Sequence, residues 1–220
     1  MGTITRNAAN NFTTSGVILP AAINDASVAS ISELENAAAG GALTLISEQT
    51  ASASASISFT TGIDSTYPIY KFEFINIHPA SDAVDFQFNM STDGGSNYNV
   101  VKTSTFFYAL HNEAGSSTNL AYTTSRDLAQ STSFQDLGGS FGNDNDQNTS
   151  GEVFIFSPSS TTFVKHYLVK IGYNDATDNF INAYIGGYAN TTSAINGVQF
   201  KFSSGNIDSG TIKLYGIKGD

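Results

Sequence analysis

The sequence predicts an all-β chain, a jelly-roll-like antiparallel β-sandwich preceded by an N-terminal extended arm. From residue 43 onward, apolar and polar residues alternate with period two in many short runs, which is typical of strands with one buried face. Clusters of Gly, Asn, Asp and Ser separate these runs at short intervals and supply turn conformations. Helical periodicity is weak after residue 42, so the pattern favours a sandwich or jelly roll over βαβ units.

Length and composition set further bounds. A chain of 220 residues suits one large β domain with an arm, and 16 Phe and 10 Tyr supply its core. Cysteine is absent, which excludes disulfides, a thiol nucleophile and a Cys-ligated zinc site. We expect no cofactor.

Charge and hydropathy argue against two classes of partner. Lys and Arg number 9 against 19 Asp and Glu, for a formal net charge of −10, whereas nucleic-acid binding requires clustered basic residues. No apolar run is long enough to span a membrane, and the first residues lack a signal-peptide pattern. We therefore expect a chain made in soluble form, with neither nucleic acid nor membrane as a partner.

Residues 1–42 differ from the rest and define the predicted arm. Ser30 and Glu33 have capping-box spacing and Gly40-Gly41 would end a helix, so the pattern allows a short helix over 25–38. Two interpretations stay open: a flexible tail, or an arm that orders only against a partner. In the second, the partner would be bound by the apolar residues Val17, Ile18, Leu19, Ile23, Ile31 and Leu34.

The predicted sandwich domain covers residues 43–220, and its first half contains the clearest alternation. The strongest strand is expected over 70–77, and Asp93-Gly94-Gly95 predicts a hairpin turn because these residues tolerate positive φ. The other strands expected in this half lie at 43–46, 53–59, 84–90 and 105–109.

The second half is harder to interpret before residue 152. The stretch 111–121 is expected to be a loop, 125–134 is either a strand or a helical turn, and 138–151 is expected to be a long polar loop. Strands follow at 152–156, 163–173 and 180–188, where Gly186-Gly187 indicates a bulge or a close backbone approach. The alternating runs 198–202 and 211–214 predict a closing hairpin.

Catalytic signatures are weak. His78, His111 and His166 lack metal-binding spacing, and the chain has no G-x-S-x-G motif. Glu73 lies in an expected strand, but no partner carboxylate for glycoside hydrolysis is singled out. We therefore expect a protein without enzymatic activity.

One loop suggests a metal. Asp144, Asp146 and Asn148 occur at alternating positions, as ligands do in an oxygen-lined calcium loop. The EF-hand pattern then fails, because Thr149 stands where Gly is needed and Glu152 comes too early. The alternative is a solvated loop without metal.

The tyrosines suggest a second kind of site. A set of them could form a stacking platform for sugars, or could be core and rim aromatics. The set consists of Tyr98, Tyr108, Tyr122, Tyr173, Tyr184 and Tyr188.

Two stretches carry a resemblance to a known group. The run LISEQTASASASISFTTGIDSTYPIYKFEFINIHPASDAVDFQFNMSTDGGSNY and the close SSGNIDSGTIKLYGIK resemble small virion structural proteins of tailed phages, many of them marine or cyanobacterial. The resemblance covers roughly residues 43–218 and contains strand and turn patterns without a catalytic signature. The shorter run TITRNAANNFTTSG resembles the opening of phage tail and fibre proteins.

The resemblance implies a jelly-roll-like sandwich displayed on the virion. It would be a capsid decoration or cement protein that clamps neighbouring subunits through its arm, or a tail fibre, adaptor or receptor-binding tail protein. The partners implied are major capsid or tail proteins, further copies in a homotrimer, and, for the tail role, a host surface glycan. Because the sequence lacks a fibre-shaft repeat, we favour decoration.

Overall fold

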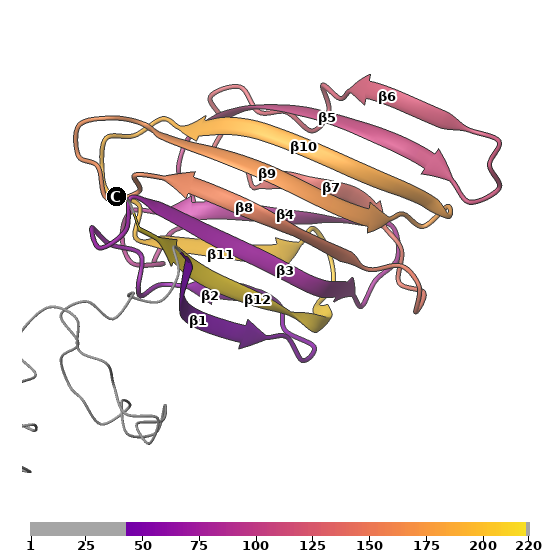
Figure 1. Cartoon of the computed structure of the whole chain (residues 1–220), viewed down its shortest axis with the longest axis horizontal. Coiled ribbons are helices and arrows are strands. Elements are labelled where there is room, and N and C mark those ends of the chain that lie inside the picture. Colours follow the sequence, from indigo (N-terminus) through magenta and orange to yellow (C-terminus); the bar gives the residue numbers. More distant parts are fainter. Residues whose placement is uncertain (1–42, 219–220) are drawn as a thin grey trace, which may run out of the picture. The chain divides into compact units, whose positions relative to one another are not determined.

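A computed structural model describes residues 43–218, and within them it contains twelve strands in two antiparallel sheets (Figure 1). The strands are β1 (Leu43–Thr50), β2 (Ile57–Phe59), β3 (Ile69–Pro79), β4 (Val84–Ser91), β5 (Lys102–Asn112), β6 (Thr118–Tyr122), β7 (Gln135–Phe141), β8 (Thr149–Phe156), β9 (Lys165–Asn174), β10 (Asn179–Ala189), β11 (Gly197–Phe202) and β12 (Ile207–Ile217). The arm, its expected helix over 25–38 and its six apolar residues lie outside the described residues. No helix among residues 43–218 is long and apolar enough to cross a membrane.

The strand order is that of a jelly roll, which confirms the predicted fold. The large sheet begins β1-β12-β3-β8, and the small sheet is β2-β11-β4-β7. In each sheet, strands from the start of the chain therefore pair with strands from its end, as in the two Greek keys of a jelly roll. In Figure 1, yellow β12 lies between the indigo strands β1 and β3.

Two inserted hairpins widen the large sheet to eight strands. β5 and β6 come between β4 and β7 in the chain, and β9 and β10 come between β8 and β11. The β9–β10 hairpin joins the sheet beside β8 and the β5–β6 hairpin joins beside β10, which completes the order β1-β12-β3-β8-β9-β10-β5-β6. The result is a broad face on the side of the large sheet that points away from the small sheet (Figure 1).

The core is dominated by aromatic rings from both sheets. The Phe200 ring on β11 lies 5.2 Å from Phe72 and 5.1 Å from Phe74 of β3, measured between centroids. The alternation predicted for 70–77 and 198–202 is confirmed over these residues, since Tyr70, Phe72 and Phe200 are fully buried. Period-two alternation therefore identified the core-facing side of these strands.

The predicted closing hairpin is wrong. β11 pairs with β2 and β4 in the small sheet, whereas β12 pairs with β1 and β3 in the large sheet. The turn between them carries the chain from one layer to the other. Each of the two strands buries one apolar face. These faces can pack against each other only if the strands belong to opposite sheets of the sandwich.

The hairpin expected at Asp93-Gly94-Gly95 is also wrong, although a turn is present. Gly94 and Gly95 have φ of 71° and 90°, as the prediction requires. However, β4 pairs with β7 and β11, and the following β5 joins the other sheet. The Asp93 carboxylate accepts bonds from the Ser91 hydroxyl and the Asn97 amide, so local bonding stabilises the turn without strand pairing.

The expected strand over 53–59 is shorter in the structure. Only β2 is a strand, because the chain crosses between the sheets over the preceding residues and Ala53 has a φ of 50°. Ala53 and Ala55 are exposed, whereas Ile57 and Phe59 are buried. An alanine gains little from burial, so the alternation of small residues did not determine a strand.

Two strands lie where loops were expected. β6 occupies part of 111–121, and β7 together with the start of β8 occupies part of 138–151. β6 is an edge strand with mostly exposed side chains on both faces, so its sequence does not alternate. β7 contains Gly138, where a Cβ would lie 2.6 Å from the Tyr173 ring, so tertiary packing rather than strand propensity selects this residue.

The Gly186-Gly187 pair is not a bulge. The register of β10 with β5 and with β9 runs through both residues without a shift. At Gly187 an added Cβ would lie 2.5 Å from the Tyr167 hydroxyl and 2.8 Å from the Thr103 carbonyl oxygen. The second expectation, a close approach of neighbouring atoms to the backbone, is therefore confirmed at Gly187.

Candidate functional site

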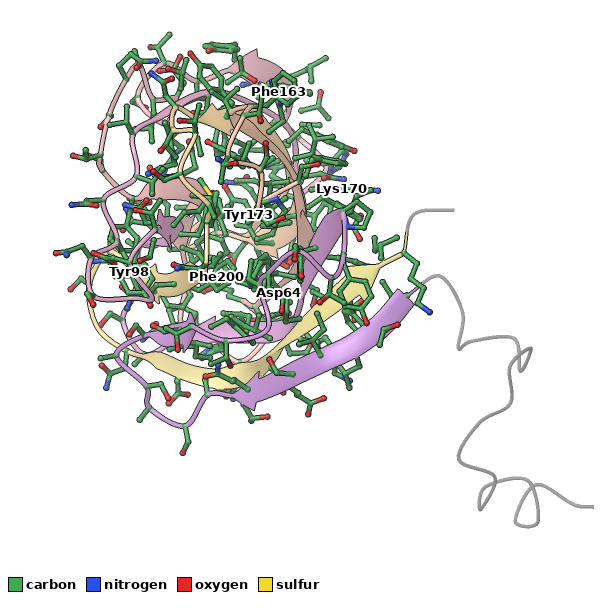
Figure 2. All side chains as sticks on the ribbon, turned by 90° about the vertical axis from the view of Figure 1, so that its left-hand side faces the viewer. Asp64, Tyr98, Phe163, Lys170, Tyr173 and Phe200 are labelled. Carbon is green, nitrogen blue, oxygen red and sulfur yellow. The ribbon has the colours of Figure 1, made fainter. Side chains whose placement is uncertain are left out.

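The outer face of the large sheet gathers side chains from five neighbouring strands. The register places Glu152 of β8, Lys170 of β9, Tyr184 of β10, Phe107 of β5 and Tyr122 of β6 in one row across the sheet. Adjacent members of the row are direct cross-strand neighbours, so their side chains contact one another. Figure 2 shows Lys170 pointing away from the sandwich.

An apolar hollow of about 410 Å³ lies on one side of this row. Its walls include Phe107, Tyr184, Leu168 and Phe154, and Gly186 leaves the space between them open. The rings of Phe107 and Tyr184 are stacked, with centroids 5.3 Å apart and planes inclined by 12°. The hollow is therefore lined by two parallel aromatic rings that pack against each other.

A polar hollow of about 440 Å³ adjoins the apolar one. It shares Glu152 and Lys170 with the apolar hollow and adds Glu73, Ser150 and Asn182. The Oδ1 atom of Asn182 is buried and has no hydrogen-bond partner among the described residues. An unpaired buried acceptor of this kind costs about 1–3 kcal/mol.

The charges around the polar hollow are partly paired. The Lys71 Nζ lies 2.9 Å from Glu152 and 3.4 Å from Glu73. Burial favours the neutral form of Lys71, but the contacts with Glu152 and Glu73 outweigh it and hold the pKa of Lys71 above its usual value. The two carboxylates are therefore held in place while their side chains stay about one-third exposed.

The same outer face exposes further large apolar side chains. Their exposed fractions range from 43% to 76%, whereas large apolar side chains of the core are almost fully buried. An apolar patch of this kind marks a contact site for a ligand or partner. The five residues are Phe107, Leu120, Tyr122, Leu168 and Phe180.

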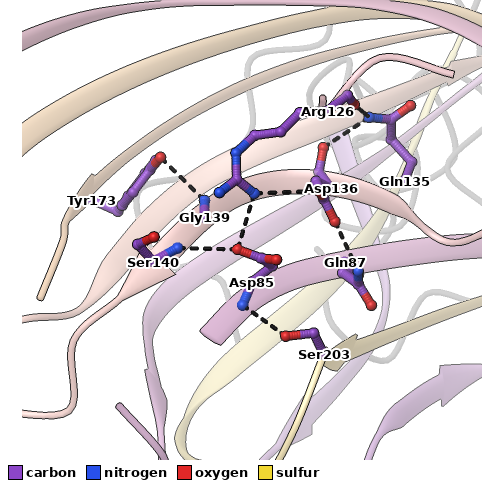
Figure 3. A network of polar contacts seen from close by, with 9 residues as sticks. All are labelled: Asp85, Gln87, Arg126, Gln135, Asp136, Gly139, Ser140, Tyr173 and Ser203. Carbon is purple, nitrogen blue, oxygen red and sulfur yellow. Dashed lines mark hydrogen bonds and ion pairs between the residues drawn. The ribbon is translucent and has the colours of Figure 1, made fainter. Parts of the chain in front are cut away.

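A second cluster of charged groups lies around Arg126, in the segment between β6 and β7 (Figure 3). The Arg126 guanidinium donates to Asp85 of β4 at 2.9 Å and to Asp136 of β7 at 3.2 Å. Gln87 donates to the other oxygen of Asp136 at 2.7 Å. These groups satisfy one another, so we interpret this cluster as a structural tie between the inserted hairpin and the small sheet.

Burial raises the pKa of two acidic groups in and beside this cluster. Burial raises the pKa of Tyr173 to about 12, and its hydroxyl accepts a hydrogen bond from the Gly139 amide. Burial, together with the neighbouring Asp85 charge, raises the pKa of Asp136 even though Gln87 and Arg126 oppose that effect. Asp136 is thus a carboxylate whose charged state depends on its partners.

The predicted sugar platform is wrong as a set, because its tyrosines are dispersed. Tyr122 and Tyr184 share the outer face, but Tyr173 is buried in the core and Tyr108 packs partly against it. Phe107 supplies the ring between Tyr122 and Tyr184, and sequence reasoning missed it. Consecutive aromatic residues in one strand could have indicated it, since they place one ring on each face.

The calcium hypothesis gains no support from the geometry. Among residues 43–218, no three His, Asp or Glu side chains gather as metal ligands would. Asp144 and Asp146 are exposed, and the Asp144 carbonyl oxygen closes a turn by accepting the Gln147 amide at 2.9 Å. The segment therefore forms a turn, and calcium binding by its side chains stays a prediction.

Comparison of the chain with protein-family models, with curated proteins and with solved structures gives no match. Interpretation of the outer face therefore depends on its own geometry and on the resemblance described above.

A buried lysine gives a testable pH dependence. The Lys102 Nζ lies in the core and donates to the Asn89 side-chain oxygen at 2.5 Å and to the Val100 carbonyl oxygen at 2.8 Å. Burial lowers the pKa of Lys102 from 10.5 to about 7. The unfolded chain thus binds more protons between these values, and the free energy of unfolding should fall as the pH falls from 10.5 towards 7, by at most about 1.4 kcal/mol per pH unit.

The variant Lys102→Met should lose this slope, because methionine does not titrate. The Asn89 oxygen still accepts the Met90 amide, whereas the Val100 carbonyl oxygen loses the bond from Lys102. The substitution should therefore lower stability by a pH-independent amount, and the slope with pH is the quantity compared. Urea unfolding at a series of pH values measures the slope, and Lys170→Met, at an exposed position, is the matched control. Equal slopes in the wild type and Lys102→Met would show that Lys102 titrates normally.

Proposed function

We propose that the chain is a non-enzymatic structural protein of a phage particle, made in the host cytoplasm and assembled into the virion. In this proposal the jelly roll is displayed, and residues 1–42 clamp neighbouring subunits as in a capsid decoration or cement protein. The observation that carries the proposal is the broad apolar outer face of the large sheet, since such faces serve contacts with other molecules. The resemblance to phage virion proteins supports a phage particle as the assembly.

The jelly roll is suited to display because its own strands complete its core. The buried apolar residues of the described unit extend from Ala51 to Leu214, all of them within the predicted sandwich domain. Residues 1–42 would then be available to contact other virion proteins. Each large apolar side chain of the arm that becomes fully buried would contribute about 1.5–3 kcal/mol, less the cost of ordering it. We propose a homotrimer, since several arms attach more tightly than one.

A tail role is the second candidate, as a fibre-associated, adaptor or receptor-binding protein. The stacked pair of Phe107 and Tyr184 favours it, because exposed stacked rings suit a receptor glycan. The copy number per purified particle, measured by mass spectrometry against the major capsid protein, separates the roles. Hundreds of copies support decoration, and a few to a few dozen support the tail. Absence from particles contradicts both.

Deletion of residues 1–42 tests the clamp. We expect the shortened chain to keep its β-sheet circular dichroism and its thermal midpoint, because the core lies within residues 43–218. It should no longer sediment with particles that lack the native protein. The full-length chain with Leu19→Asp is the milder comparison, and it should attach more weakly. Loss of the β signal in the shortened chain would show instead that residues 1–42 belong to the core.

A further inference from the structure

We propose that the two adjoining hollows on the outer face of the large sheet bind an uncharged oligosaccharide. The apolar hollow would hold one sugar ring against Phe107 and Tyr184, and the polar hollow would hold the hydroxyl groups of the next. This inference rests on the glycan contact proposed above for the tail role, which uses the same two rings, and it adds the class of sugar and the two hollows that would hold it.

The apolar half is suited to a pyranose ring. One face of many pyranoses carries only C–H groups, which pack on aromatic rings, and Phe107 and Tyr184 both line the hollow with aromatic rings. Leu168 and Phe154 complete the hollow. Both aromatic residues lie on paired strands, so the wall is held rigidly by the sheet.

Gly186 is the most informative residue of this half. A glycine in the middle of a paired strand weakens it, and the usual reasons are a bulge, a left-handed backbone or a close contact. The register shows no bulge at Gly186, and its φ lies outside the left-handed region. An added Cβ would meet only Leu168 at 3.6 Å and Thr105 at 3.8 Å, which is ordinary contact. The remaining explanation is that Gly186 keeps the hollow open for a ligand.

The polar hollow is suited to binding hydroxyl groups. The carboxylates of Glu73 and Glu152, whose side chains are 36% and 33% exposed, accept hydrogen bonds from donors, whereas the Lys170 ammonium needs an acceptor. A sugar hydroxyl donates and accepts at once, so neighbouring hydroxyls of one ring can satisfy both kinds of group. The pairing of an apolar wall with convergent polar groups is typical of small-ligand sites.

The charges favour an uncharged sugar. Two carboxylates, Glu73 and Glu152, are balanced by two ammonium groups, Lys71 and Lys170, around the polar hollow. The whole chain carries a formal net charge of −10, which repels acidic polysaccharides at a distance. A bound peptide strand fits less well, because the hollows lie over β9 and β10, whose edges are both paired.

Saturation-transfer NMR on the full-length chain tests the site, with neutral gluco-, galacto- and manno-oligosaccharides and one uronic-acid oligosaccharide as probes. We expect transfer to the C–H face of at least one neutral sugar and none to the acidic one. Gly186→Val should fill the hollow and lower the affinity by about tenfold or more, with the thermal midpoint retained. Tyr184→Ala should act likewise through loss of the wall. Ala109→Val, an outward-facing change on β5 that lines neither hollow, should bind as the wild type does.

Two results would overturn this inference: no transfer to any neutral sugar at millimolar concentration, or equal binding by Gly186→Val and the wild type. Neither result would affect the virion role, which the copy number per particle decides independently. A third outcome is that neither the wild type nor Gly186→Val binds a sugar, and that Gly186→Val fails to attach to particles that the wild type binds. The outer face would then be a contact surface for another protein.

Discussion

Replacing Phe200 by alanine is expected to lower the free energy of unfolding by about 3–5 kcal/mol. The Phe200 ring is fully buried between the two sheets, where Figure 2 places it. Five other rings surround it, with centroid distances from 5.1 to 6.4 Å, contributed by Phe59, Phe72, Phe74, Phe86 and Phe88. These rings come from β2, β3 and β4, so they cannot close together over the cavity without moving both sheets.

Urea unfolding of the two proteins gives the difference directly. Leu120→Ala is the control, because Leu120 is 76% exposed and its truncation should change the free energy by less than about 0.5 kcal/mol. Phe200→Leu should fall between, since it retains part of the buried volume. A cost for Phe200→Ala similar to that of the control would mean that the core repacks and that the ring cluster is not rigid.

Replacing Arg126 by methionine is expected to lower the free energy of unfolding by about 2–3 kcal/mol, a value reduced from that of a fully buried pair because the Arg126 side chain is 23% exposed. The substitution leaves Asp85 and Asp136 close together without a cation (Figure 3). Since Arg126 lies between β6 and β7, the inserted hairpin also loses its tie to the small sheet. Thermal and urea unfolding of the variant measure the cost.

The pH dependence separates charge from packing in this variant. Without the guanidinium, burial and the Asp85 charge raise the pKa of Asp136 further. A carboxyl group whose pKa is higher in the folded chain adds stability below its unfolded pKa, and that stability is lost as the pH rises through the folded pKa. The deficit of Arg126→Met should therefore shrink at acidic pH.

A charge-neutral combination is the matching control for Arg126. Arg126→Met combined with Asp85→Asn and Asp136→Asn should recover a large part of the loss at neutral pH, because no charge then stays unpaired. A deficit that is independent of pH, and that the combined variant keeps in full, would assign the effect to the packing of the arginine stem alone.

The candidate site could be anticipated only in part. The tyrosines suggested a site for stacking sugars. In the structure, however, the row across the outer face brings Tyr184 and Tyr122 to either side of Phe107, which lies on a separate strand. Cross-strand neighbours depend on register, and register depends on pairing between segments far apart in the chain. The glycine that leaves the hollow open, Gly186, was noticed in the sequence, but its surroundings came only from β5 and β9.

The sequence by itself determined that the chain is an all-β sandwich and which face of its strongest strands is buried, because period-two alternation is a local property of strands. Tyr70, Phe72 and Phe200 were assigned to the core in this way. Only the tertiary structure decided how strands pair. β11 and β12 are consecutive but lie in different sheets, and the edge strand β6, with its side chains mostly exposed, leaves no alternating pattern. The physical reason is that alternation records how one strand meets the core, whereas sheet membership and the outer face depend on contacts between distant strands.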